Sequence, residues 1–130
     1  DAEVFEPLSK AYGLPSGTEE EKAEKERVME TVLKAASEAP FGIMELCMEA
    51  IDIVSRFSEI GSKIAISDAG CAAACCRAAL NAASLNVFIN TKLMKDRAYA
   101  EEMNKRAEEM LELGNVKADA IFDTVKSGLI

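Results

Sequence analysis

The stretch of sequence that decides the fold is Ser67–Asn90, which reads SDAGCAAACCRAALNAASLNVFIN. Ala, Gly and Ser fill most of its first half, and side chains this small let neighbouring helices approach closely. No strand pattern of convincing length occurs here or elsewhere in the chain. Because Arg77, Asn81 and Asn86 interrupt the apolar run, we expect a buried or interface helix rather than a membrane span.

Outward from this stretch, local signals predict further helices. Thr18 and Glu21 form a capping box, in which each side chain can bond the backbone of the other residue. Pro40 suits the first turn of a helix, where its missing N–H costs nothing, and Gly114-Asn115 suggests a kink or break. The expected helices cover residues 1–12, 18–38, 40–61, 68–92 with Ser67 as N-cap, and about 96 onward. The sequence therefore predicts an all-α fold, an antiparallel bundle of about five helices in one domain, 1–130.

Composition narrows the classes of function. The chain has 130 residues, 49% of them hydrophobic, and a formal net charge of −8. The apolar content suffices for a core, whereas the acidic balance argues against a general affinity for nucleic acid or an anionic membrane. Because the chain has no histidine, any acid–base chemistry in it falls to carboxylates, Lys, Tyr or Cys.

The four cysteines are best interpreted as reduced structural thiols. Cys71, Cys75 and Cys76 lie within six residues of one helical pattern, and Cys47 stands apart. Such a cluster cannot bridge distant parts of a small secreted fold, and a zinc site would need further ligands. We therefore expect no metal site, and a cytoplasmic location.

Polar residues in the central helix are the candidates for a site. At 100° per residue, Asp68, Asn86 and Asn90 share one side of the helix. Asp68 and Asn86 are 18 residues apart, roughly 27 Å along the axis, so they cannot serve one small site on that helix. Asn86 and Asn90 are one turn apart and can. The alternative is that these amides tie neighbouring helices together.

Basic residues have two interpretations each. Arg77 lies on the opposite side of the helix and needs a carboxylate partner or an anionic ligand, of which we favour the ion pair. Lys92, Lys95 and Arg97 cluster at the junction of the last two helices. They would attract an anionic substrate tail or form a solvated loop.

Several motifs, taken together, resemble the cyclodeaminase/cyclohydrolase family. That family includes the C-terminal domain of formiminotransferase-cyclodeaminase and stand-alone bacterial methenyltetrahydrofolate cyclohydrolases. The matching segments, in chain order, are DAEVF (1–5), AYGLP (11–15), TEEEK (18–22), the start of the third predicted helix (39–46), SDAG (67–70), ASLNVFIN (83–90) and LMKD (93–96). The resemblance covers almost the whole chain.

The resemblance implies an enzyme of one-carbon metabolism with a tetrahydrofolate derivative as substrate and no covalently bound cofactor. It implies that Asp1 is the acid/base, with Asp68 as second candidate, and that Asn86 and Asn90 bind the pterin or orient the one-carbon unit. Arg77 occupies a position where the family commonly has Arg, with a role at the substrate, in the structure or at a dimer interface. Family members are homodimers or larger assemblies.

Three functions stay open on the sequence. The first is a cyclodeaminase that converts 5-formiminotetrahydrofolate to 5,10-methenyltetrahydrofolate and ammonia; the second is a methenyltetrahydrofolate cyclohydrolase. The third is a non-catalytic helical dimerisation module. Family members also carry an N-terminal helical region not seen in these residues, so we expect the C-terminal part of a larger helical domain, inactive by itself.

Overall fold

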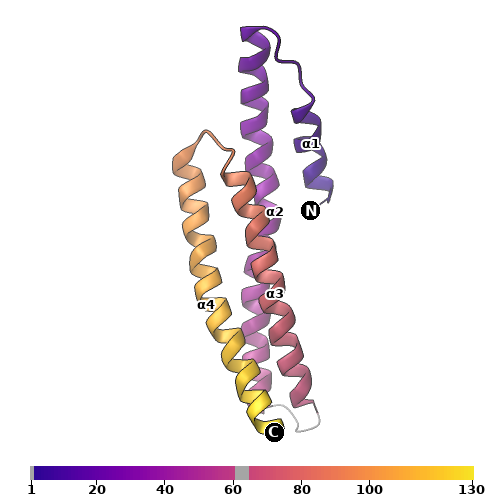
Figure 1. Ribbon diagram of the computed structural model, residues 1–130, viewed down its shortest axis with the longest axis vertical. Helices are drawn as coiled ribbons and strands as arrows, with labels where there is room; N and C mark the ends of the chain where they lie inside the picture. Colours follow the sequence, from indigo (N-terminus) through magenta and orange to yellow (C-terminus); the bar gives the residue numbers. More distant parts are fainter. Residues whose placement is uncertain (1, 61–64) are drawn as a thin grey trace.

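The structure, a computed structural model, describes residues 2–60 and 65–130, and these form four helices (Figure 1). The helices are α1 (Ala2–Tyr12), α2 (Glu19–Ile60), α3 (Ile66–Thr91) and α4 (Arg97–Leu129). Three long helices, α2, α3 and α4, alternate in direction, and the short α1 lies beside the N-terminal half of α2. The described residues contain no strand, which confirms the all-α class.

The prediction of about five helices is wrong at Pro40, which lies inside α2 instead of starting a new helix. A proline within a helix leaves the carbonyl four residues earlier without its backbone donor. Here that carbonyl belongs to Ala36, and the side-chain amide of Asn90 in α3 donates a hydrogen bond to it at 3.2 Å. The donor from α3 thus replaces the missing N–H, and α2 continues for 42 residues.

Apart from Pro40, the predicted helix starts at Thr18 and near Asp96 are confirmed, and the one at Ser67 is not. In the capping box, Thr18 Oγ1 accepts from the backbone N–H of Glu21 at 3.1 Å, and the Glu21 carboxylate accepts from the N–H of Thr18 at 3.1 Å. Asp96 caps α4 by accepting from the N–H of Tyr99 at 3.1 Å. The helix α3, however, begins at Ile66 with Ala65 as N-cap and no side-chain cap, so Ser67 does not have the predicted role.

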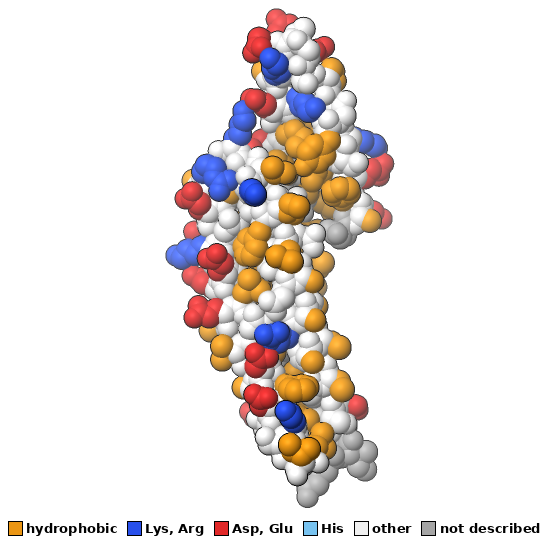
Figure 2. All heavy atoms as spheres, in the orientation of Figure 1, with side chains coloured by type: hydrophobic (Ala, Val, Ile, Leu, Met, Phe, Trp, Pro, Cys, Tyr) orange, Lys and Arg blue, Asp and Glu red, His pale blue; other side chains and the backbone are white. Residues whose placement is uncertain are grey.

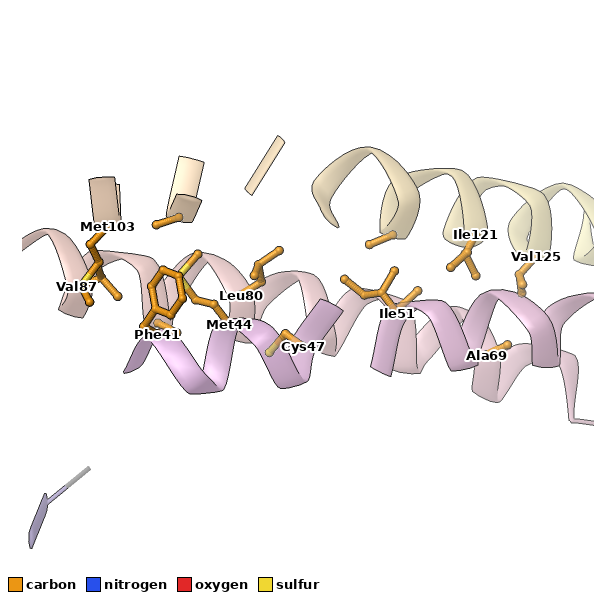
Figure 3. Close-up of a cluster of buried hydrophobic side chains, with 14 residues drawn as sticks. Phe41, Met44, Cys47, Ile51, Ala69, Leu80, Val87, Met103, Ile121 and Val125 are labelled. Carbon is orange, nitrogen blue, oxygen red and sulfur yellow. The ribbon is translucent and has the colours of Figure 1, made fainter. Parts of the chain in front are cut away.

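The core lies between α2, α3 and α4. Figure 3 shows the core side chains spread along the bundle, among them Met44 and Ile51 of α2 and Leu80 and Val87 of α3, which are all fully buried. The helix α4 is continuous through Gly114, so the break that the sequence offered as one alternative is absent. A Cβ at Gly114 would lie 2.4 Å from Leu80 Cδ2 and 2.7 Å from the Met48 sulfur. Gly114 is therefore explained by the close approach of the three helices.

The helix α3 is unusual because its apolar residues are distributed around the helix and are not gathered on one face. By length and composition alone it is the one described helix that could cross a membrane, a test that core helices of soluble proteins also pass. Only 28% of its most apolar 18-residue stretch is buried within this chain. Helices that are apolar all round are normally covered on all sides.

Candidate functional site

A cavity of about 340 Å³ lies where α1 meets the C-terminal half of α3. Its floor is apolar, and α3 contributes two amide side chains, Asn86 and Asn90, one turn apart. The lining residues are Phe5, Leu8, Tyr12, Ala36, Asn86, Ile89, Asn90 and Leu93. An apolar pocket with a few convergent polar groups is the usual form of a small-molecule site.

The two amides are held differently. Asn90 is half-buried and is fixed by its bond to the carbonyl of Ala36, while the more exposed Asn86 donates to the carbonyl of Ala82 in its own helix at 3.1 Å. Each of these bonds uses one N–H, and an amide has a second N–H and a carbonyl oxygen for a ligand. Asn90 therefore ties α3 to α2, as the structural alternative predicted, and it also lines the cavity, where binding of a substrate stays a prediction.

A second cavity of about 340 Å³ shares Tyr12 and Leu93 with the first. Three lysines lie along it, and each already has a partner. Lys22 pairs with Glu19 and Lys95 with Glu26, whereas Lys25 donates to the carbonyls of Tyr12 and Leu14 at 2.8 and 2.9 Å. Lys25 thus holds the connection between α1 and α2, and Glu26 and Glu30 in the same lining offset the positive charge of the lysines.

The junction between α3 and α4 is fixed by side chains of α2. The Glu30 carboxylate accepts from the N–H groups of Lys95 and Asp96 at 2.7 and 3.1 Å. Lys34 lies 2.6 Å from Asp96, and this bond, with that from the Tyr99 N–H, holds the pKa of Asp96 below its ordinary value. Of the basic residues predicted to cluster here, Lys95 is paired as above and Arg97 donates to the carbonyls of Thr91 and Met94 at 2.9 and 3.2 Å, whereas Lys92 is exposed.

Arg77 has the predicted ion pair. Its Nε lies 2.8 Å from Asp119 Oδ1 of α4, and both side chains are about half exposed. The pair lies outside the amide cavity and links α3 to α4. A role in substrate binding at that cavity therefore has no support from the geometry.

Of the two predicted acid/base residues, the structure describes only Asp68, and it does not bring Asp68 to the amide cavity. Asp68 is exposed in the first turn of α3, and Asn86 is in its C-terminal half. The 18 intervening residues correspond to roughly 27 Å of helix. Asp1 lies outside the described residues, and α1 begins at Ala2.

The structure adds residues that the sequence did not single out. Phe5 and Tyr12 of α1 line the cavity opposite the amides, and nothing in their spacing distinguished them from ordinary apolar positions. Burial raises the pKa of the Cys47 and Cys76 thiols, which makes them poor nucleophiles. Within residues 2–60 and 65–130, no group of three His, Cys, Asp or Glu side chains is placed to hold a metal ion.

Comparison with known proteins assigns the helical unit to a family. A family model described as formiminotransferase-cyclodeaminase matches residues 1–109, and the chain belongs to this family. The chain is 40% identical over 127 residues to the methenyltetrahydrofolate cyclohydrolase of Methylorubrum extorquens, covering 98% of this chain and 61% of that protein. It is 25% identical over 127 residues to the formimidoyltransferase-cyclodeaminase of Sus scrofa, covering 98% of this chain and 24% of that protein.

A solved structure agrees with this assignment. The formiminotetrahydrofolate cyclodeaminase of Thermotoga maritima superimposes with a TM-score of 0.67 at 27% sequence identity, over 96% of this chain and 56% of that chain. The predicted resemblance is thereby confirmed. The chain spans about three fifths of the cyclohydrolase and of the solved cyclodeaminase that it matches.

Proposed function

We propose that this chain provides part of an enzyme acting on the one-carbon bridge between N5 and N10 of a tetrahydrofolate. The observation that carries the proposal is the 40% identity to a methenyltetrahydrofolate cyclohydrolase across 98% of the chain. The amide cavity supports it, because a pterin presents broad ring faces to an apolar wall and an edge of amide-like donors and acceptors to polar groups. Asn86 and Asn90 offer donors and acceptors to such an edge.

Among the two reactions, we place the cyclohydrolase first. The sequence alone had favoured the cyclodeaminase, but the identity to the cyclohydrolase is 40%, against 24–27% for the cyclodeaminases. Water would add to the methenyl carbon to give a tetrahedral intermediate. Its C–N5 bond would then break to leave the 10-formyl form and release a proton. The cyclodeaminase stays the second candidate, because the Thermotoga protein with a similar structure is a formiminotetrahydrofolate cyclodeaminase.

Residue roles follow from the family resemblance and from the cavity together. Asn86 and Asn90 would orient the pterin and the one-carbon unit, and Asp1 would move the proton as the first catalytic candidate. Asp68 is the second candidate, and it would need to act on a site other than the amide cavity. An apolar surrounding favours the neutral form of a carboxyl group, which suits it to proton transfer near neutral pH.

We also propose that the protein acts as a homo-oligomer in the cytoplasm. Large apolar side chains exposed on the surface support association, as Phe122 (43% exposed) and Leu129 (59%) near the end of α4 illustrate. A location with reduced thiols is supported by the spacing of Cys71, Cys75 and Cys76 along one helix. Sedimentation velocity of the purified chain tests the first point.

The enzymatic proposal is tested in a chimera in which residues 1–130 replace the matched part of the Methylorubrum cyclohydrolase. We expect the chimera to consume 5,10-methenyltetrahydrofolate, seen as a fall in methenyl absorbance. Ammonia release from 5-formiminotetrahydrofolate with rising methenyl absorbance would favour the cyclodeaminase instead. If neither folate is converted faster than without protein, the proposal is wrong.

Variants of the chimera then test the residue roles. Asn86→Ala should raise KM for the folate at least several-fold, and Arg77→Gln is the control that should leave turnover unchanged. Asp1→Asn should abolish turnover. Unchanged turnover would remove Asp1 from the mechanism and direct the search to Asp68.

A further inference from the structure

An apolar stripe runs along the outer side of α3. Its members recur at alternating spacings of four and three residues, the pattern by which one helix packs against another. They are Cys71, Cys75, Ala78, Ala82, Leu85 and Ile89, and all six are exposed. Leu85 is 68% exposed and Ile89 is 62% exposed. A helix of this composition is normally covered on this side too.

The neighbouring helix α2 has a matching stripe in its C-terminal half. It comprises Ile43, Leu46, Ala50, Ile53, Phe57 and Ile60, again at three- and four-residue spacings. Leu46 is 64% exposed, Ile53 68% and Ile60 83%. We call the two stripes together the open α2/α3 face.

The open α2/α3 face continues a helix-packing surface that is already in use. At one end, α1 packs against α2, and its Phe5, Leu8 and Tyr12 share a cavity with Ile89 of α3. But α1 has only 11 residues, whereas α3 has 26. Figure 1 shows α1 ending about halfway along the bundle, and in Figure 2 apolar side chains recur along the α3 edge below it.

Charged residues border the apolar stripe on α2 and limit what can cover it. Glu49, Arg56 and Glu59 are exposed beside it, and Asp52 pairs with Lys117 of α4 at 2.7 Å. An apolar stripe with charges along its flank matches the face of one amphipathic helix. It does not match a lipid bilayer, which would require the charges to be buried in hydrocarbon.

We infer that the open α2/α3 face binds an amphipathic α-helical segment supplied by polypeptide outside residues 1–130. The size of the relatives supports this occupant, because the match covers 98% of this chain but only 61% of the Methylorubrum cyclohydrolase and 56% of the solved cyclodeaminase. Relatives with this helical unit therefore contain further polypeptide, and it is long enough to include such a helix. The inference rests on the packing and the family, and is independent of the proposed reaction.

The test mixes the 130-residue chain with the unmatched segment of the Methylorubrum cyclohydrolase, made as a separate polypeptide. We expect a one-to-one complex by sedimentation velocity and a gain in helical circular dichroism. The Leu46→Glu/Ile53→Glu double variant and the Leu85→Glu variant should each weaken binding at least tenfold. Because these side chains are exposed, the variants should fold with unchanged helix content when alone.

The matched control is Leu113→Glu/Val116→Glu on α4, whose side chains are similarly exposed, at 58% and 67%. It should bind the segment as the unsubstituted chain does. No complex with the unsubstituted chain, or equal loss in the α4 control, would overturn the inference. Self-association of the chain, or its binding to phosphatidylcholine vesicles, would also overturn the inference under two conditions. The face variants would have to abolish it, and the added segment would have to fail to compete with it.

Discussion

Asn90 shows how a single amide can have two roles in this protein. Its Nδ2 donates to the carbonyl of Ala36, which Pro40 leaves without a backbone partner. An unsatisfied buried carbonyl costs about 1–3 kcal/mol, so this contact allows a proline in the middle of α2. The same side chain lines the cavity beside Asn86. Its loss is therefore expected to change both stability and folate binding.

The structural role predicts coupling between Asn90 and Pro40. Asn90→Ala should lower the free energy of unfolding by about 1–2 kcal/mol, because Ala36 then lacks a donor. In a Pro40→Ala background the backbone N–H returns, so the same substitution should cost less. A double-mutant cycle by urea denaturation measures the difference. Strict additivity of the two substitutions would show that the hydrogen bond has no such role.

The glycine at position 114 is explained by the short distance to side chains of α2 and α3, and not by backbone flexibility. Gly114→Ala places a methyl group against Leu80 and Met48, and overpacking of this kind costs about 1–3 kcal/mol. Gly42→Ala in α2 is the control, because among the described residues no side chain or neighbouring segment lies within 4 Å of a Cβ added there. It should stabilise by up to about 1 kcal/mol through helix propensity. Thermal unfolding measures both variants, and an equal change in the unfolding temperature of the two would contradict the explanation.

These two residues also show what the sequence could not predict. Pro40 has the local signature of a helix start, and the donor that keeps α2 continuous is 54 residues away from Ala36 in sequence. Gly114 has the local signature of a break, and the reason for it lies on two other helices. By contrast, the capping box at Thr18 involves residues three apart, and it was predicted correctly.

At the scale of elements, side chains of α2 set the junction between α3 and α4. Glu30 accepts two backbone N–H groups there, and Lys34 bonds to Asp96, the N-cap of α4. Lys34 also lies over the Tyr99 ring, 4.7 Å from its centre. These contacts fix where α4 starts and hence how it returns along the bundle.

The lowered pKa of Asp96 predicts an acid-sensitive junction. A carboxylate whose pKa falls on folding stabilises the native state above its unfolded-state pKa of 3.8, and this contribution is lost as pH falls through the folded-state value. Asp96→Asn retains a good N-cap but loses the charged partner of Lys34. The variant should therefore unfold at a lower temperature than the unsubstituted chain at pH 7. This difference in unfolding temperature should close as the pH falls below 3.8 and through the lowered pKa of Asp96. A gap independent of pH would contradict the assignment.

The Arg77–Asp119 pair joins α3 to α4 at the surface. Because both side chains are about half exposed, solvent screens the pair, and Arg77→Gln should lower the free energy of unfolding by less than about 1 kcal/mol. The loss should shrink further in 1 M salt. Denaturation at low and high salt measures it, and a loss well above this range would point to a function beyond a surface ion pair.

At the scale of the whole molecule, the sequence predicted which residues are apolar but not which of them the chain itself would cover. The stripe through Leu85 and Ile89 reads like core, yet both side chains are exposed. Helical periodicity identifies a face, whereas the partner of that face depends on tertiary contacts that local patterns do not encode. The amide cavity was half predicted for the same reason: Asn86 and Asn90 were placed together, but the wall formed by α1 was not.

The four cysteines differ in exposure, and their reactivity therefore measures which faces of the helices are covered. Cys71 and Cys75 are exposed on the open α2/α3 face, whereas Cys47 and Cys76 have thiols whose pKa is raised by burial. Since the thiolate is the reactive form, iodoacetamide at pH 8 should modify the first two at least tenfold faster than the others in the folded chain. Mass spectrometry of timed samples measures the rates, and the four should converge in denaturant.

The same labelling distinguishes a free face from a covered one. If the open α2/α3 face binds a helical segment, adding that segment should slow modification of Cys71 and Cys75 and leave the slow pair unchanged. Slow labelling of Cys71 and Cys75 in the chain alone, independent of any added segment, would mean that another surface of the same protein already covers α3. Dilution would then identify that surface, because protection by a second copy decreases with concentration and protection within one chain does not.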